Sequence, residues 1–197
     1  MPASRWFVFT ALIVLALCPS LAHAAKGYGF QVWAATTYVS PLSERDRNIS
    51  GITNAVKASN EMGYQFGAEL RGGSFGLALD YLHAKHELQG SSGLLGTTDF
   101  NPISASLYIH LPTPVVETYL GPTVSYVNWG DLSTSTGTQS VDAKLGYGLT
   151  LGADLPLGPA LAIGAGLRWL KLDAATDNIA SFAVDPLISR LGLSLRF

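Results

Sequence analysis

Residues 144–155 of this 197-residue chain read KLGYGLTLGADL, a run in which the residue type changes at every second position. Its odd positions from 145 to 155 are all apolar, while its even positions hold glycine, threonine or a charged residue. Because successive side chains of a β-strand point to opposite faces, this alternation predicts a strand with one apolar face. An amphipathic helix would instead place apolar residues three or four positions apart.

The same alternation recurs in seven further segments. They cover residues 30–35, 62–71, 75–81, 103–111, 120–126, 161–169 and 190–197. Short and long connections alternate strictly between the segments, and the long ones cover residues 41–61, 89–99, 130–139 and 174–184. Short periplasmic turns and longer outer loops are typical of outer-membrane barrels. The sequence therefore predicts an all-β fold, an eight-stranded antiparallel transmembrane β-barrel.

The charged residues distinguish a membrane barrel from a soluble β-sandwich. They make up 13% of the chain, about half the share of a soluble domain. Eight of them alternate with the apolar positions: Glu69, Arg71, Asp80, Lys144, Asp154, Arg168, Arg190 and Arg196. A charge that faces lipid at the bilayer midplane costs about 2–4 kcal/mol, so we expect these side chains inside the barrel. Lys85 and Lys171 lie at segment ends, where the membrane interface tolerates them.

The first 24 residues have the pattern of a secretory signal peptide. Arg5 precedes the apolar residues 6–17, and Ala22-His23-Ala24 supplies small residues for cleavage. We expect cleavage before Ala25 and a single barrel domain over residues 25–197. Cys18 also faintly resembles a lipoprotein box, although such a box requires a small residue where this chain has Leu17. Cys18 is the only cysteine, so we expect no disulfide in the mature chain.

Several function classes are disfavoured by composition and spacing. The net charge of −2 and the lack of a basic run argue against a nucleic-acid partner. His83 and His86 are three positions apart on an expected strand, so they point to opposite faces and do not form a simple metal site. No Ser-His-acid set gathers at the outer rim, and we expect interfacial histidines, no cofactor and no enzymatic activity.

Six short motifs follow one another in a consistent order along the mature chain. They are Val39-Ser40-Pro41 with Glu44, Asn60 with Gly63, Asn101-Pro102, Tyr119-Leu120-Gly121 with Ser125-Tyr126, Val184-Asp185-Pro186 and the terminal Leu195-Arg196-Phe197. Their order resembles the OmpW family of eight-stranded outer-membrane proteins. Pro122, Leu187 and Leu195 depart from the family pattern, where glycine, tryptophan and tyrosine are usual. The terminal Phe197 is similar to the signal by which outer-membrane proteins engage their assembly machinery.

This resemblance implies a narrow barrel in the outer membrane of a Gram-negative bacterium. Relatives of this kind admit small hydrophobic molecules, which leave sideways through the barrel wall into the membrane. The partners implied are outer-membrane lipid and a small hydrophobic ligand.

The inward-facing positions of four segments become apolar towards the outer end of the expected barrel. The residues concerned are Leu82, Leu170, Leu172 and Ile188, with Trp33 as a neighbour at mid-height. We expect these five to line an apolar ligand pocket that opens to the outside, while packing beneath folded loops is the alternative. Nearer the periplasm, a tight mixture of both charge signs predicts a paired plug, formed by Glu69, Arg71, Glu117, Asp154 and Arg196.

Together these features predict passive uptake of small hydrophobic molecules through a narrow lumen. The alternative is a non-transporting barrel that anchors or binds partners through its extracellular loops, among which residues 132–140 are rich in serine and threonine.

Overall fold

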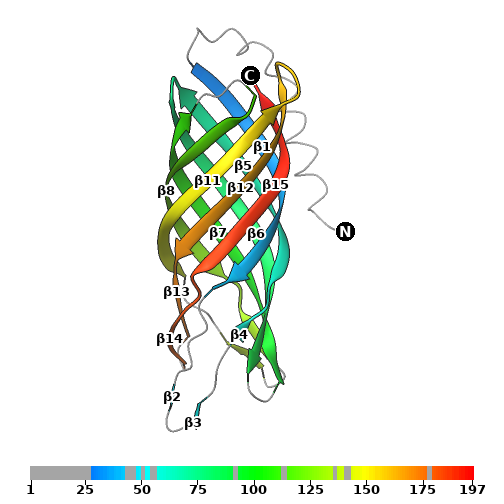
Figure 1. Ribbon diagram of the computed structural model, residues 1–197. Coiled ribbons are helices and arrows are strands. Elements are labelled where there is room, and N and C mark those ends of the chain that lie inside the picture. The colour runs from blue at the N-terminus through cyan, green and yellow to red at the C-terminus, as the bar shows by residue number, and fades with distance from the viewer. Residues whose placement is uncertain are drawn as a thin grey trace.

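The computed structural model describes residues 28–42, 48–49, 52–53, 57–90, 93–111, 115–134, 137–139, 143–176 and 179–197. The expected signal peptide lies outside these residues, as does Glu44. Eight strands form the barrel: β1 (Tyr28–Pro41), β5 (Glu61–Gly72), β6 (Phe75–Gly90), β7 (Gly93–Leu111), β8 (Glu117–Trp129), β11 (Lys144–Pro156), β12 (Leu161–Lys171) and β15 (Pro186–Arg196). Each pairs antiparallel with its neighbour, and β1 closes the sheet by pairing with both β5 and β15 (Figure 1). The predicted eight-stranded antiparallel barrel is confirmed.

The two ends of the barrel differ. The end that carries the C-terminus, uppermost in Figure 1, has short connections such as the turn at Gly73, whose φ is +61°. The opposite end extends into further short strands: β2 (Asn48–Ile49), β3 (Ile52–Thr53), β4 (Lys57–Ala58), β9 (Leu132–Thr134), β10 (Gly137–Gln139), β13 (Asp173–Thr176) and β14 (Ile179–Ala183). The connections expected as loops thus contain much strand pairing. Outside the membrane neither face of a strand must be apolar, so this pairing left no alternation in the sequence.

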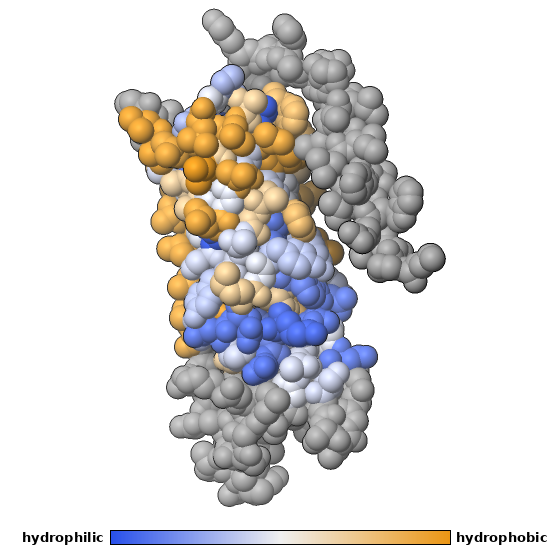
Figure 2. Space-filling view, turned by 90° about the vertical axis from the view of Figure 1, so that its right-hand side faces the viewer, coloured by the Kyte–Doolittle hydropathy of each residue, from blue (hydrophilic) through white to orange (hydrophobic). Residues whose placement is uncertain are grey.

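Side chains along the barrel strands alternate between buried and exposed. In β8 the odd residues from Tyr119 to Trp129 are buried and the even ones are exposed. The exposed side chains are large and apolar; Leu149, for example, is 60% exposed and Phe66 52%. Figure 2 shows hydrophobic side chains gathered over the wall near the C-terminal end and a hydrophilic band nearer the outer end. A continuous apolar wall of this kind fits a surrounding of lipid.

The aromatic residues expected at the membrane interfaces project from this wall. Tyr38, Tyr81, Tyr126 and Trp169 are all exposed, whereas the side chain of Tyr28 lies outside the described part. No helix in the described ranges is long and apolar enough to cross a membrane.

The eight charged residues predicted to face inward all lie on the inner parity of their strands. Glu69, Asp80, Asp154 and Arg168 are at most 4% exposed. Lys85 is exposed on the outer surface, and Lys171 Nζ donates a 2.8 Å hydrogen bond to Asp185 Oδ2. The sorting of charge that the sequence predicts is therefore confirmed.

A charge on the lipid-facing wall should destabilise the barrel strongly only near the middle of the bilayer. Leu149→Arg, near the middle of β11, is expected to destabilise the barrel by about 2–4 kcal/mol, whereas Asn128→Arg, near the outer end of β8, should cost about 0–1 kcal/mol. Urea unfolding of the protein in lipid vesicles measures both changes. Equal costs at the two positions would contradict the placement of the bilayer around the middle of these strands.

Candidate ligand-binding site

An apolar cluster fills the outer part of the lumen. The outer apolar cluster consists of Val39, Leu82, Ala84, Phe100, Val127, Trp129, Leu170, Leu172, Val184 and Ile188. Four of the five residues predicted for the ligand site belong to it. Leu82 and Leu170 are 0% exposed and Ile188 is 3% exposed, so these side chains pack against one another.

The remaining six members were not predicted from the sequence. Among them, the rings of Phe100 on β7 and Trp129 on β8 have centroids 5.0 Å apart. The sequence does show that two of them face inward, because Ala84 continues the inward parity of Leu82, and Trp129 continues that of Ser125. The regular alternation stops before these positions, so the segments expected as strands do not include them.

The structure does not bring Trp33 together with the other four predicted residues. Trp33 joins a second cluster nearer the middle of the barrel, with Ala78, Tyr108 and Tyr119. The guanidinium carbon of Arg190 lies 5.0 Å from the centroid of the Trp33 ring. Trp33 therefore contacts a charged group and does not belong to the outer apolar cluster.

A buried ion pair lies directly beneath the outer apolar cluster. Asp80 and Arg168 each stand two residues closer to the periplasm than Leu82 and Leu170 on the same strands. Arg168 Nη1 and Nη2 donate to Asp80 Oδ1 and Oδ2 at 2.8 and 2.6 Å, a bidentate arrangement. Gln65 Nε2 also donates to Asp80 Oδ1, at 2.6 Å.

A row of hydroxyl groups continues this polar layer around the inner wall, over the adjacent strands β11, β8 and β7. Arg168 Nε donates to Thr150 Oγ1 at 3.0 Å, Thr150 Oγ1 lies 2.7 Å from Thr123 Oγ1, and Thr123 Oγ1 lies 2.8 Å from Ser106 Oγ. We call Gln65, Asp80, Ser106, Thr123, Thr150 and Arg168 the polar barrier. It separates the outer apolar cluster from the periplasmic half of the lumen.

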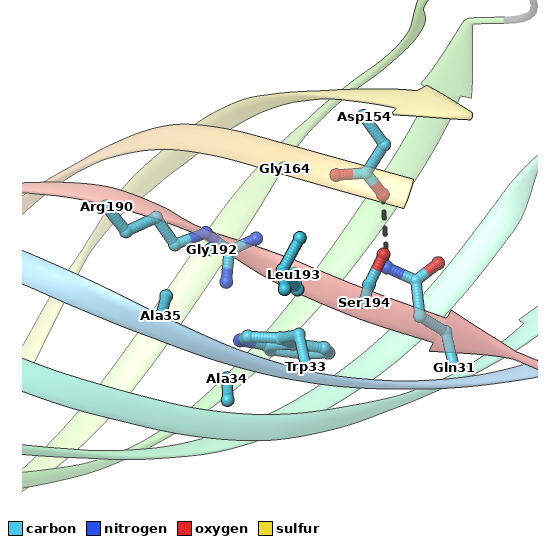
Figure 3. Close-up of a pocket in the computed structure, with 10 residues that line it drawn as sticks. All are labelled: Gln31, Trp33, Ala34, Ala35, Asp154, Gly164, Arg190, Gly192, Leu193 and Ser194. Atoms are coloured by element: carbon cyan, nitrogen blue, oxygen red, sulfur yellow. Dashed lines mark hydrogen bonds between the residues drawn. The ribbon is translucent and has the colours of Figure 1, made fainter. Parts of the chain in front are cut away.

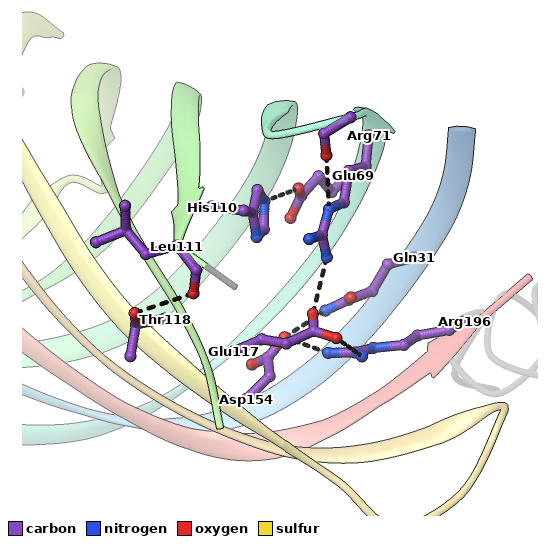
Figure 4. Close-up of polar contacts among 10 residues, drawn as sticks. Gln31, Glu69, Arg71, His110, Leu111, Glu117, Thr118, Asp154 and Arg196 are labelled. Carbon is purple, nitrogen blue, oxygen red and sulfur yellow. Dashed lines mark hydrogen bonds and ion pairs between the residues drawn. The ribbon is translucent and has the colours of Figure 1, made fainter. Parts of the chain in front are cut away.

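Paired charges fill the periplasmic end of the lumen, as the sequence predicts (Figure 4). Glu117 accepts from Arg71 Nη1 at 2.8 Å and from Arg196 Nη1 at 3.0 Å. Arg196 Nη2 also contacts Asp154 Oδ2 at 3.2 Å. We call these four residues the periplasmic network. Glu69, expected in the same plug, contacts a different partner.

Two of the three histidines of the expected mature chain lie inside the barrel. His110 Nε2 lies 2.5 Å from Glu69 Oε1, and His86 Nδ1 lies 2.9 Å from the carbonyl oxygen of Ser59. His110 and His86 are only 4% and 2% exposed, so the expectation of interfacial histidines is wrong for both. The even positions of these strands point inward, and each ring finds a hydrogen-bond partner there.

His86 and His83 occupy opposite faces of β6, as expected from their spacing. His86 faces the lumen above the apolar band of the wall, towards the outer end, and burial lowers the pKa of its imidazole below the ordinary histidine value. Nowhere in the described residues do three His, Cys, Asp or Glu side chains gather as a possible metal site.

The hydrogen-bonded wall is interrupted beside the outer apolar cluster. The β6–β7 ladder lacks the pairs Leu82–Pro102 and His83–Asn101, although the register is the same on both sides. Proline has no N–H group to donate, which accounts for the interruption. On the outer surface Tyr81 Oη donates to Asn101 Oδ1 at 3.1 Å, and His83 Nδ1 lies 2.6 Å from the same oxygen. We call this interruption the wall gap.

Comparison with solved structures bears on the fold. OprG from Pseudomonas aeruginosa superposes with a TM-score of 0.77 at 15% identity, over 88% of this chain and 98% of OprG. AlkL gives a TM-score of 0.62 at 21% identity, over 89% of this chain and 95% of AlkL. By fold, the chain is an eight-stranded outer-membrane β-barrel.

The outer membrane protein W of E. coli gives a TM-score of 0.54 at 14% identity, over 89% of this chain and all of that protein (100%). No protein-family model matches the sequence, and no curated protein matches it. The resemblance to the OmpW family therefore rests on the order of the sequence motifs and on a shared barrel.

Proposed function

We propose that this barrel mediates passive entry of small hydrophobic molecules across the outer membrane of a Gram-negative bacterium. The observation that carries the proposal is the placement of the outer apolar cluster directly above the polar barrier. Leu82, Leu170, Leu172 and Ile188 would contact the ligand, and Trp33 would lie deeper, below the barrier. The process needs no catalytic residue.

A ligand would enter by displacing side chains of the outer apolar cluster. Burial of apolar surface contributes about 25 cal/mol per Å², so a small hydrocarbon gains free energy when it leaves water for this cluster. The cluster is packed, with Leu82, Phe100 and Leu170 at 0% exposure, so entry and side-chain motion are coupled. Uptake would thus be selective for apolar molecules and slow for polar ones.

The polar barrier favours a sideways exit. An apolar molecule that moved on towards the periplasm would have to separate Asp80 from Arg168, and breaking a buried ion pair costs about 3–5 kcal/mol. The wall gap offers an alternative path, since the strand ladder is interrupted there, and a ligand that took it would displace the fully buried side chains of Leu82 and Pro102. We propose that the ligand passes between β6 and β7 into the membrane.

Phe197 is proposed to engage the outer-membrane assembly machinery. Its N–H donates to the Phe30 carbonyl oxygen at 2.8 Å, which extends the pairing between β15 and β1 to the last residue. The signal would therefore lie on the seam that closes the barrel.

Uptake of a fluorescent hydrophobic dye by whole cells tests the proposed function. The double variant Leu82→Asp and Leu170→Asp should lower the uptake rate to that of cells that lack the protein, because an apolar ligand cannot replace water around two carboxylates. Leu42→Asp is the matched control, since Leu42 is 55% exposed just beyond β1. Heat-dependent mobility in gel electrophoresis checks that each variant forms a folded barrel.

Equal dye uptake by cells with and without the wild-type protein would contradict transport. That result would favour the alternative, a barrel that acts through its extracellular loops.

A further inference from the structure

Arg190 differs from the other arginines inside the barrel. Arg71, Arg168 and Arg196 each contact a carboxylate, whereas within the described ranges Arg190 makes no ion pair. Its Nη2 donates to the hydroxyl of Tyr119, and its guanidinium lies over the rings of Trp33 and Tyr119, at 5.0 and 5.8 Å from their centroids. Among the residues that the structure describes, the guanidinium charge of Arg190 therefore has no anionic partner in the lumen.

A small cavity adjoins this guanidinium (Figure 3). It is lined by Arg190, Trp33, Ser194 and Asp154, and by Gly164 and Gly192, which are paired across β12 and β15. Neither glycine has room for a side chain, because a Cβ atom on Gly164 would lie 2.6 Å from Asp154 Oδ1 and one on Gly192 would meet the carbonyl oxygen of Ala34. The cavity has room for about one water-sized particle.

Three buried polar atoms along this cavity have no hydrogen-bond partner among the described residues. They are Arg190 Nη1, Trp33 Nε1 and Ser194 Oγ. Trp33 is 8% exposed and Ser194 3% exposed, so bulk water does not reach these atoms freely. Figure 3 shows the indole nitrogen of Trp33 on the side nearest the guanidinium, with Ser194 towards Asp154 and Gln31.

We propose that this cavity binds a small monovalent inorganic anion, such as chloride, between Arg190 Nη1 and Trp33 Nε1. Both groups are N–H donors, one of them charged, and a buried donor without a partner costs about 1–3 kcal/mol. An anion satisfies both donors and compensates the guanidinium, whereas a water molecule satisfies the donors but leaves the charge uncompensated.

The carboxylate at the far end of the cavity does not oppose this assignment. Asp154 Oδ2 accepts from Gln31 Nε2 at 3.0 Å and from Arg196 Nη2 at 3.2 Å, so its charge is already compensated. The anion would come from the periplasmic side, where the side chains of Arg196 and Glu117 are 18% and 27% exposed. The site lies below the polar barrier and is independent of the proposed uptake of hydrophobic molecules.

Bromide provides a direct test of the anion site. The folded protein is prepared in sodium gluconate, whose anion is too large for the cavity, and bromide replaces gluconate at constant ionic strength. Because an anion that binds only the folded state stabilises it, the urea midpoint should rise with the logarithm of the bromide concentration once that concentration exceeds Kd. Crystals grown in bromide should show an anomalous peak between Arg190 and Trp33.

Two variants separate this site from general salt effects. Arg190→Gln should abolish the rise of the urea midpoint with bromide, while Arg71→Gln, which changes an arginine of the periplasmic network, should retain it. If Arg190→Gln does not fold, Trp33→Phe keeps the aromatic ring but removes the N–H donor, and the rise of the urea midpoint should begin at a higher bromide concentration. A water molecule without anomalous signal in the cavity, bromide only on the outer surface, or the same bromide response in wild type and variant would each overturn the proposal.

Discussion

Replacing Arg168 by methionine is expected to destabilise the folded barrel by about 3–5 kcal/mol. The substitution removes both donors that hold Asp80 and leaves that carboxylate buried, at 4% exposure, with Gln65 as its remaining side-chain donor. The same change removes a donor to Thr150 and so opens one end of the hydroxyl row. Urea unfolding in lipid vesicles, followed by tryptophan fluorescence, measures the loss.

The double variant Arg168→Met and Asp80→Leu is the matched control. It removes both charges of the ion pair, so it should recover most of the stability that the single variant loses. A single variant that loses less than about 1 kcal/mol, the range of an exposed ion pair, would contradict the description of the polar barrier as a buried pair.

A reversible cross-link across the wall gap is expected to block uptake. His83→Cys and Asn101→Cys place two thiols at facing positions of β6 and β7, where the native side chains already approach to 2.6 Å. Cα atoms of facing residues on antiparallel strands are about 4.5–5.5 Å apart, within the range that a disulfide spans. If the ligand leaves between these strands, dye uptake should stop on oxidation and return on reduction.

A second cross-link on an intact part of the wall serves as the control. Leu145 and Tyr126 are paired on β11 and β8 and both side chains are exposed. Leu145→Cys with Tyr126→Cys should form a disulfide without changing uptake. If the cross-link at the wall gap leaves the uptake rate unchanged as well, the exit between β6 and β7 is refuted.

Most of the barrel could be predicted because its lipid environment imposes one rule on every strand. A side chain such as Leu149 must be apolar where it faces lipid, and a charge such as Asp154 must point inward, so alternation reveals both strand and orientation. The charged plug followed from the same rule, since Arg71 and Arg196 could only point into the lumen beside Glu117.

Contacts between side chains of different strands could not be predicted in the same way. The wall gap depends on the register that sets Pro102 opposite Leu82, and a single sequence does not fix the register of two strands joined by a long connection. Glu69 was expected beside Arg71 but contacts His110, which comes from another strand at the same height. The separation of Trp33 from Leu82 depends likewise on Arg190, which covers its ring.

The position of a bound apolar molecule would show whether the outer apolar cluster is the ligand site. A crystal structure of the protein soaked with 1-iodooctane would locate the iodine by its anomalous signal. We predict iodine among Leu82, Leu170 and Ile188, above the ion pair of Asp80 and Arg168. Iodine found only on the lipid-facing wall, or within the periplasmic network, would contradict ligand binding in the outer apolar cluster.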